Sequence, residues 1–206
     1  MSTLSAPNDF ANASSTAGNT FSFTVTAQDR FGNTDTGYPG TVHFSSTDPS
    51  PGVVLPGNST LVNGTRAFTA TLDQAGTQRI TGTDTANGTI TGSLSIQVTA
   101  AAAASLSLAV PSNAVANTPF NATVTLTDRF GNIATGYRGT VSFSTSDLVA
   151  AQLGKMPANY AFTASDAGSH TFSVTLVTPS SQTITVTDVS NGNLSATSSP
   201  IAVSLI

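Results

Sequence analysis

Two short loops of the sequence repeat the same pair of potential metal ligands at the same spacing. Asp29 and Asn33 stand at the two ends of the pentapeptide DRFGN, and Asp128 and Asn132 stand at the ends of an identical pentapeptide. Carboxylate and amide oxygens are the ligands that Ca²⁺ takes, but calcium requires about six to eight oxygens and each loop offers one carboxylate. The same residues are typical of a turn in which Asp and Asn side chains hydrogen-bond nearby backbone. We prefer the turn interpretation and keep calcium binding as a hypothesis.

Two tyrosines are candidate ligand-binding residues. Tyr38 and Tyr137 lie in matching Gly-Tyr-x-Gly segments directly before a predicted strand. An exposed tyrosine ring can stack on a sugar ring; the alternative, which we prefer, is that the rings pack on the edge of the fold with the hydroxyl reaching the backbone. The next residue is Pro39 in one segment and Arg138 in the other, so a shared ligand site would differ in charge.

The other polar residues do not form a catalytic or zinc-binding pattern. The chain has two histidines, His43 and His170, at non-equivalent positions, and it has no cysteine. A catalytic triad needs a base within hydrogen-bond reach of its nucleophile, and a zinc site needs several His or Cys ligands. His43 lies between Val42 and Phe44 in an alternating run, so we expect it to face solvent. We predict that the chain is not an enzyme and that it takes no cofactor other than the calcium considered above.

These residues recur because the chain contains two copies of one unit. Phe21–Asp48 matches Phe120–Asp147 without a gap, at residue numbers that differ by 99. Arg66–Gly88 matches His170–Gly192 at a difference of 104, so the second copy has five extra residues, between Leu148 and Ser169. A period of about 100 residues predicts tandem domains rather than a solenoid of short repeats.

Five alanines at residues 100–104 separate the two copies. So short a run does not nucleate a helix by itself, and we therefore predict a short connector. The predicted domains are residues 1–99 and 105–206, joined by this alanine linker.

Apolar residues alternate with Ser and Thr at a period of two within each copy. The clearest runs contain Phe21, Phe23, Val25 and Ala27 in the first copy and Phe120, Ala122, Val124 and Leu126 in the second. One buried face and one hydroxyl-bearing face predict antiparallel sheets packed face to face. Asn87-Gly88 and Asn191-Gly192 separate further alternating runs and predict tight hairpin turns with positive φ. The predicted fold class is all-β, with two tandem immunoglobulin-like antiparallel β-sandwich domains of about seven strands each.

Charge and hydropathy exclude some classes of partner. Charged residues make up 8% of the 206 residues, and the formal net charge is −4, which disfavours nucleic acid. No run approaches the roughly 20 apolar residues of a membrane span, so we expect no membrane insertion. The opening residues Met1-Ser2-Thr3 lead into polar sequence, so we expect an export signal and any anchor to lie outside this sequence. We expect a monomer.

The order of the repeated segments resembles the immunoglobulin-like repeats of large bacterial surface proteins. These segments are DRFGN, then GYPGTVHF or GYRGTVSF, then AGTQRITGTD or SSQTITVTD. Invasin and intimin stalks are the best-known relatives, and filamin-type repeats are more distant ones. The resemblance covers nearly all of both copies, and it implies an immunoglobulin-like sandwich, export and a repetitive parent protein, with no chemistry of its own.

On this resemblance we expect a non-catalytic spacer or stalk module of a secreted or cell-surface bacterial protein, with a role related to adhesion. Its location would be extracellular, and its partners would be the neighbouring domains of the parent protein. One alternative is a module that binds carbohydrate or a host surface protein through loops at one end of the second copy. Another is an accessory domain of a secreted enzyme.

Overall fold

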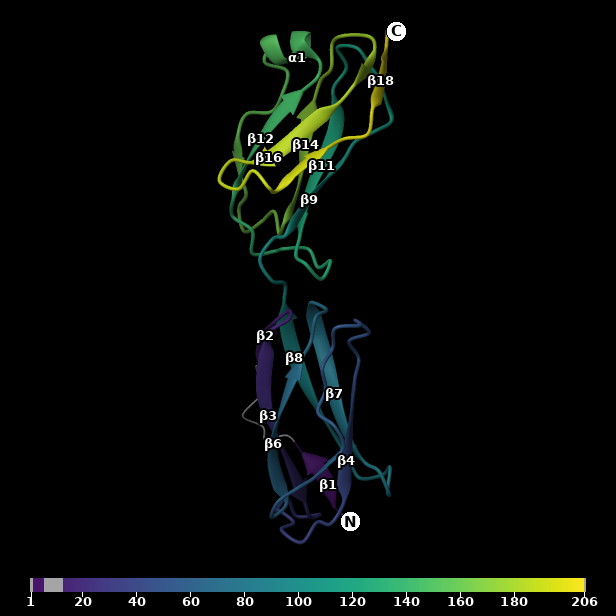
Figure 1. Ribbon diagram of the computed structural model, residues 1–206, viewed down its shortest axis with the longest axis vertical. Helices are drawn as coiled ribbons and strands as arrows, with labels where there is room; N and C mark the ends of the chain where they lie inside the picture. The colour runs from purple at the N-terminus through teal and green to yellow at the C-terminus, as the bar shows by residue number, and fades with distance from the viewer. Residues whose placement is uncertain (1, 6–12, 206) are drawn as a thin grey trace. The chain divides into compact units, whose positions relative to one another are not determined.

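The computed structural model describes residues 2–5 and 13–205 (Figure 1). The chain divides into two compact units, Met1–Ala100 (unit 1) and Ala101–Ile206 (unit 2), and each is described by itself. The domain limits drawn from the sequence stay a prediction. The described residues form strands and loops apart from one short helix, α1 (Leu148–Gln152), so the predicted all-β class is confirmed. None of their helices is long and apolar enough to cross a membrane.

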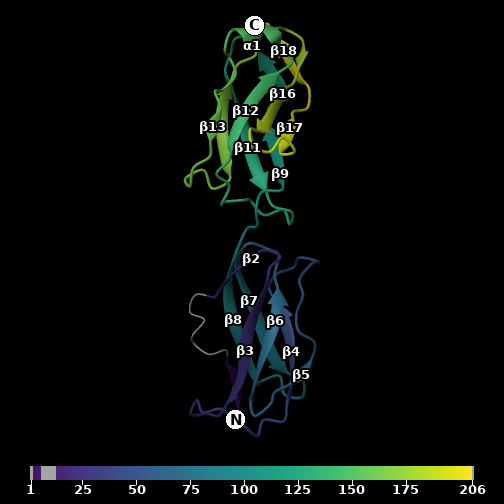
Figure 2. The ribbon, with the colours of Figure 1, turned by 60° about the vertical axis from the view of Figure 1, so that its left-hand side comes forward.

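Unit 1 consists of two sheets (Figure 2). The first has the order β1–β3–β6 and contains β1 (Thr3–Ser5), β3 (Thr20–Gln28) and β6 (Thr65–Thr71). The second has the order β2–β8–β7–β4–β5 and contains β2 (Ser14–Thr16), β8 (Thr91–Thr99), β7 (Gly76–Asp84), β4 (Thr41–Ser46) and β5 (Ser59–Thr60). Neighbouring strands are antiparallel, except that β2 and β8 are parallel.

Unit 2 repeats this arrangement, but its second sheet is broken into two. The first sheet has the order β14–β11–β9 and contains β14 (Ser169–Val174), β11 (Phe120–Thr127) and β9 (Ser105–Ala109). The second sheet has four strands in the order β13 (Tyr160–Ala161), β12 (Thr140–Thr145), β16 (Ile184–Asp188) and β17 (Ser195–Thr197). The third has three strands in the order β10 (Asn113–Val115), β18 (Ile201–Ser204) and β15 (Ser181–Gln182). Here β10 and β18 are the parallel pair.

The break in unit 2 has a local cause. Pro200 has no N–H to donate to a ladder. Beside it, the Ser198 hydroxyl accepts the Ile184 N–H at 3.1 Å in place of a backbone carbonyl. The described residues contain eight strands in unit 1 and ten in unit 2, more than the seven predicted for each copy. The excess consists of strands of two or three residues, which are too short for alternation to reveal.

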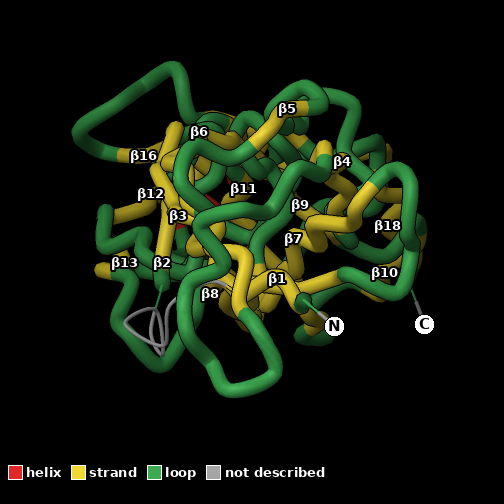
Figure 3. Tube along the Cα trace, turned by 90° about the horizontal axis from the view of Figure 1, so that it is seen from below, coloured by secondary structure: helices red, strands yellow, loops and turns green. Residues whose placement is uncertain are grey.

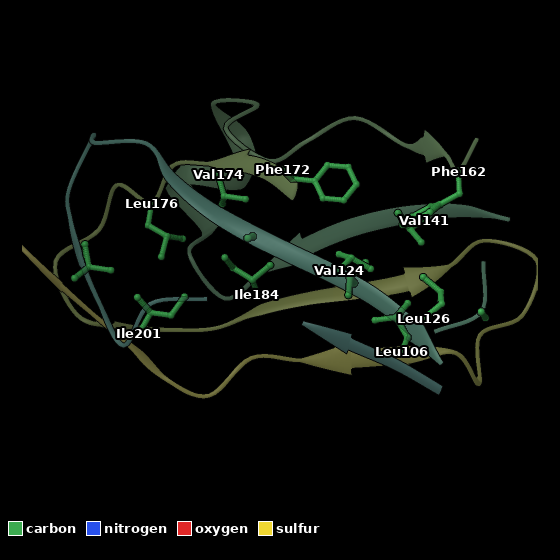
Figure 4. Close-up of a cluster of buried hydrophobic side chains, with 14 of the residues drawn as sticks. Leu106, Val124, Leu126, Val141, Phe162, Phe172, Val174, Leu176, Ile184 and Ile201 are labelled. Atoms are coloured by element: carbon green, nitrogen blue, oxygen red, sulfur yellow. The ribbon is translucent and has the colours of Figure 1, made fainter. Parts of the chain in front are cut away.

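The apolar side chains that alternate in the sequence form the buried core of each unit. In β3, Phe23, Val25 and Ala27 are at most 6% exposed, and the threonines between them are half-buried. In unit 2, Figure 4 shows Val124 of β11 among buried side chains that include Val141 and Ile184 of the facing sheet. Each such side chain contributes about 1.5–3 kcal/mol when it is buried, so the units need no disulfide. Figure 3, coloured by secondary structure, shows that the described chain consists almost entirely of strands and loops.

The hairpins at Asn87-Gly88 and Asn191-Gly192 exist, but the positive φ predicted for them is wrong. The residues with positive φ lie elsewhere, and the two connections are wider than a two-residue turn. In unit 1, the loop closes through a 2.9 Å hydrogen bond from the Asp84 N–H to the Ile90 carbonyl. The Asp84 carboxylate accepts two further N–H groups of this loop. A wide loop that is capped by a carboxylate needs no left-handed residue.

The five extra residues of unit 2 fall in two places. Val42 of β4 pairs with Ser59, whereas the equivalent Val141 of β12 pairs with Tyr160, so the numbering difference has grown from 99 to 101 (160 − 59). It reaches 104 (170 − 66) at His170 of β14, which lies where unit 1 has Arg66. Two extra residues therefore precede β13, in the segment that contains α1, and three follow it.

Candidate functional site

The DRFGN loop of unit 1 is a hydrogen-bonded turn. Asp29 Oδ1 accepts the N–H groups of Phe31 at 2.8 Å and Asn33 at 3.0 Å, and Oδ2 accepts the Asn33 side-chain amide at 3.2 Å. The Asn33 side chain, followed by these backbone donors, holds the pKa of Asp29 below its ordinary value. The carboxylate closes its own loop, as the turn interpretation predicts.

In the equivalent loop of unit 2, the aspartate accepts one more N–H group than Asp29 does in unit 1. Asp128 accepts two backbone N–H groups of its own loop and the side-chain amide of Asn132, and its Oδ2 also accepts the N–H of Ala101 at 2.9 Å. The residue is 3% exposed. Ala101 belongs to the alanine run, and the Ala104 N–H donates to the Thr127 carbonyl at 2.8 Å. The alanine run is thus fastened at two points, to the last residue of β11 and to the first residue of the DRFGN loop.

The polar atoms of the two loops are used in hydrogen bonds within the protein. In each, both carboxylate oxygens already accept N–H groups, and the asparagine side chain is used as a donor. Calcium prefers about six to eight oxygen ligands. Across residues 2–5 and 13–205, no group of three or more His, Cys, Asp or Glu residues is arranged to hold a metal ion.

We therefore predict that millimolar Ca²⁺ leaves the melting temperature unchanged relative to the same protein in chelator. A ligand raises stability only when it binds the native state in preference to the unfolded chain. Differential scanning fluorimetry with Ca²⁺, Mg²⁺ and chelator measures this. A rise of several degrees specific to Ca²⁺, lost in Asp29→Asn or Asp128→Asn, would support the calcium hypothesis.

Tyr38 and Tyr137 bind acidic side chains within their own units. Tyr38 is buried and Tyr137 half-buried, and their hydroxyls donate hydrogen bonds to the carboxylates of Asp84 and Asp188. The expectation that the hydroxyls reach backbone is wrong, because a carboxylate lies there instead. Burial, followed by the bond to the carboxylate, raises the pKa of both tyrosines well above the usual range. The burial of these rings favours the packing alternative over sugar stacking.

The second glycine of each Gly-Tyr-x-Gly segment makes this contact possible. A Cβ atom on Gly40 would overlap the carboxylate of Asp84 and the hydroxyl of Tyr38, and one on Gly139 would overlap the Tyr137 hydroxyl. The hydrogen bond between tyrosine and aspartate passes over the glycine, which explains why the motif recurs in both copies.

Arg138, the third candidate ligand residue, is exposed, and its side chain folds back on its own loop. One guanidinium nitrogen, Nη1, donates to the carbonyl oxygens of Thr135 at 2.9 Å and Tyr137 at 2.6 Å. Arg138 thus lies beside Tyr137 at the surface. Both acceptors are backbone carbonyls, and no side chain of the described residues is hydrogen-bonded to the Arg138 guanidinium.

Asp147 connects two loops that lie far apart in the sequence. It is 1% exposed; its Oδ1 accepts the Ala150 N–H and its Oδ2 accepts the N–H groups of Val177 and Thr178, at 2.7 to 3.0 Å. Burial alone would raise the pKa of Asp147, but these hydrogen bonds lower it to about 2. Asp48 has the same role in unit 1, where its carboxylate accepts the N–H group of Ser50 in its own loop and those of Asp73 and Gln74 in the loop after β6. Asp48 and Asp147 stand at the ends of the matching segments of the two copies, but their hydrogen-bond partners could not be predicted from the sequence.

The two histidines lie in different units. His43 is exposed, as predicted, and its Nδ1 lies 2.8 Å from Asn58 Oδ1. His170 is half-buried; its Nδ1 lies 2.6 Å from Asp166 Oδ1, and its ring stacks on Tyr160. The Tyr160 hydroxyl donates to the same carboxylate at 3.1 Å. Sequence reasoning missed both residues because Tyr160 corresponds to a serine, Ser59, in the first copy, and Asp166 lies in a segment that is longer in the second copy.

No protein-family model and no curated protein sequence matches the chain. Among solved structures, it is similar to the Escherichia coli adhesin FdeC, with 19% identity, a TM-score of 0.48 and coverage of 100% of this chain and 64% of that chain. It is also similar to the Yersinia pseudotuberculosis adhesin InvE, with 18% identity, a TM-score of 0.41 and coverage of 98% and 58%.

A third similar structure is the D00-D0 domain of intimin, with 11% identity, a TM-score of 0.42 and coverage of 99% of this chain and 100% of that chain. The chain thus spans less than two-thirds of the length of the two adhesin chains. These neighbours are of the invasin and intimin kind that the sequence resembles.

Proposed function

We propose that the chain is a non-catalytic spacer of a bacterial surface protein, and that each unit is built to carry tension between its ends. The observation that carries this proposal is the parallel pairing of a strand near the start of each unit with the last strand of that unit. In unit 1, Ser14–Thr16 pairs with Gln97–Thr99, and in unit 2, Asn113–Val115 pairs with Ala202–Ser204.

Parallel pairing determines how tension acts on the hydrogen bonds. The start of one strand and the end of its parallel partner lie at opposite ends of the ladder. Tension between the two ends of the unit therefore slides the strands along each other, and the hydrogen bonds between them share the force. In unit 2, these include the bond from the Ala116 N–H to the Ser204 carbonyl at 2.8 Å and the bond from the Ala202 N–H to the Ser112 carbonyl at 2.9 Å.

The polar side chains fit this role. The carboxylates of Asp29, Asp84, Asp128, Asp147 and Asp188 each accept backbone N–H groups of loops in their own unit. Their hydrogen bonds are thus used for fastening loops. The contact between Asp128 and Ala101 would also limit movement of the connector relative to unit 2. In this role the protein is extracellular and monomeric, and its partners are neighbouring domains of the parent protein.

Single-molecule pulling of the chain between its ends, with and without Ala116→Pro, tests the proposal. The substitution removes one shared hydrogen bond, worth about 1 kcal/mol, and we expect a lower unfolding force for unit 2. Unit 1 of the same molecule is the internal control, because its unfolding force should not change. If Ala116→Pro folds normally and unit 2 unfolds at the original force, the parallel pair does not carry the tension.

One observation favours the ligand-binding alternative as a second candidate. Helix α1 has no equivalent among the described residues of unit 1 and lies at the end of unit 2 where β18 ends (Figure 1). Leu148 and Val149 of this helix and its C-cap residue Leu153 are 72%, 43% and 59% exposed. Exposed apolar residues that cluster are typical of interaction surfaces. Binding on a glycan array or to a host surface protein that is lost in Leu148→Ser/Leu153→Ser would favour this candidate. Unchanged binding in that variant would exclude α1 as the contact.

A further inference from the structure

Unit 1 has an open groove between the edge strands of its two sheets, β5 and β6. Its volume is about 400 Å³, and it is lined by residues that include Val54, Leu55, Pro56, Ser59, Arg66 and Phe68. Val54 is 60% exposed, which is unusual for a valine. The guanidinium of Arg66 lies 5.5 Å from the centre of the Phe68 ring. The groove thus combines an apolar wall with an exposed cation beside an aromatic ring.

Strand register identifies the same place in unit 2. Ser59 pairs with Val42 in unit 1, and Tyr160 pairs with the equivalent Val141 in unit 2. The flanking sequences agree, since LPGNS before Thr60 matches MPANY before Ala161. On the other edge strand, Arg66 of β6 pairs with Val25 in unit 1, and His170 of β14 pairs with the equivalent Val124 in unit 2. Tyr160 therefore occupies the position of Ser59, and His170 that of Arg66.

In unit 2, the ring of Tyr160 occupies this place. Its centre lies 4.1 Å from the His170 ring, in a stacked arrangement, and 5.3 Å from the Phe172 ring, edge to face. The Tyr160 hydroxyl donates to Asp166, which belongs to the segment lengthened by three residues in unit 2. An aromatic ring held by the edge strands β13 and β14 is thus an arrangement that unit 2 already uses.

In unit 1, the neighbours of this ring have equivalents, but the position of Tyr160 is taken by a serine, Ser59. Phe68 stands where unit 2 has Phe172, and Arg66 supplies a flat cation where unit 2 has the imidazole. No carboxylate of the described residues forms an ion pair with Arg66. A guanidinium binds the face of an aromatic ring through a cation–π contact, which becomes stronger when water is excluded.

We propose that the groove of unit 1 binds an aromatic side chain, tyrosine or phenylalanine, of a partner polypeptide. The ring lies against both Arg66 and Phe68, as the Tyr160 ring lies against both His170 and Phe172 in unit 2, and Val54 covers its outer edge. This binding site is independent of the spacer role, because it uses side chains at the open edge rather than the terminal strand pair.

Nuclear magnetic resonance titration of the full chain with N-acetyl-L-tyrosinamide tests the proposal, with N-acetyl-L-alaninamide as the control ligand. We expect saturable shifts of the Ser59, Arg66 and Phe68 amides at millimolar concentration, as is usual for so small a ligand, and none with the control. Shifts that are absent up to the solubility limit would overturn the proposal. So would shifts of these amides by N-acetylglucosamine but not by the tyrosine derivative.

Exchanging the residues between the units provides matched variants. Ser59→Tyr places a ring in the groove, and we expect at least about a tenfold loss of binding together with a higher melting temperature of unit 1. Tyr160→Ser opens the groove of unit 2, and we expect new shifts at His170 and Phe172. Arg66→Gln changes an exposed residue, so it keeps the fold, and it should weaken binding about threefold. Binding that is unchanged in both Ser59→Tyr and Arg66→Gln would contradict the proposed position of the ring.

Discussion

Replacing Asp147 with alanine is expected to lower the free energy of unfolding of unit 2 by about 3–5 kcal/mol. The substitution leaves the N–H groups of Ala150, Val177 and Thr178 without an acceptor at a site that is 1% exposed. Urea denaturation followed by circular dichroism measures the loss. Asp48→Ala should have a comparable effect on unit 1, because its carboxylate accepts three N–H groups in the same arrangement.

Acid provides an independent check of the same site. The pKa of Asp147 is lowered from 3.8 to about 2, so its contribution is present above about pH 4 and is lost as the pH falls through 2. The difference corresponds to about 2 kcal/mol. This part of the acid sensitivity should disappear in Asp147→Asn, whereas Asn113→Ala, on an exposed residue, should keep it. If Asp147→Ala costs no more than Asn113→Ala, Asp147 does not hold the two loops together.

Gly139→Ala is expected to destabilise unit 2 by about 3 kcal/mol or more. The added methyl group would overlap the Tyr137 hydroxyl and the Asp188 carboxylate, so the hydrogen bond between them could not form. Thermal unfolding measures the effect. Gly136→Ala is a matched control, because a Cβ there has no atom within 4 Å, and its effect should stay within about 0.5 kcal/mol. Equal melting temperatures for the two variants would contradict the packing of tyrosine over glycine.

The sheets could be predicted from the sequence because burial on one face imposes a period of two. Phe23, Val25 and Ala27 alternate with half-buried threonines over the whole of β3, and this pattern is visible in any window of the segment. The recurrence of the DRFGN loops also indicated their role, because an Asp that caps its own turn uses partners within four residues.

Contacts between distant residues could not be predicted in this way. Tyr38 and Asp84 are 46 residues apart, and only the register of β4 with β7 brings them together. The hairpin geometry at Asn87-Gly88 was missed for a local reason: Asp84 accepts the N–H groups of Ala86 and Asn87 and caps a loop wide enough to need no positive φ. Tyr160 was missed because a residue present in one copy carries no signal in a comparison of the two.

The spacer proposal is tested most directly by pulling unit 2 in two directions. The chain has no cysteine, so a single cysteine at the exposed Thr118 provides a unique handle just beyond β10. Pulling between the two chain ends slides β10 along β18, whereas pulling between Thr118→Cys and the C-terminus separates the pair from one end, one hydrogen bond at a time. We predict a clearly higher unfolding force between the chain ends. Equal forces in the two directions would contradict a unit built to carry tension.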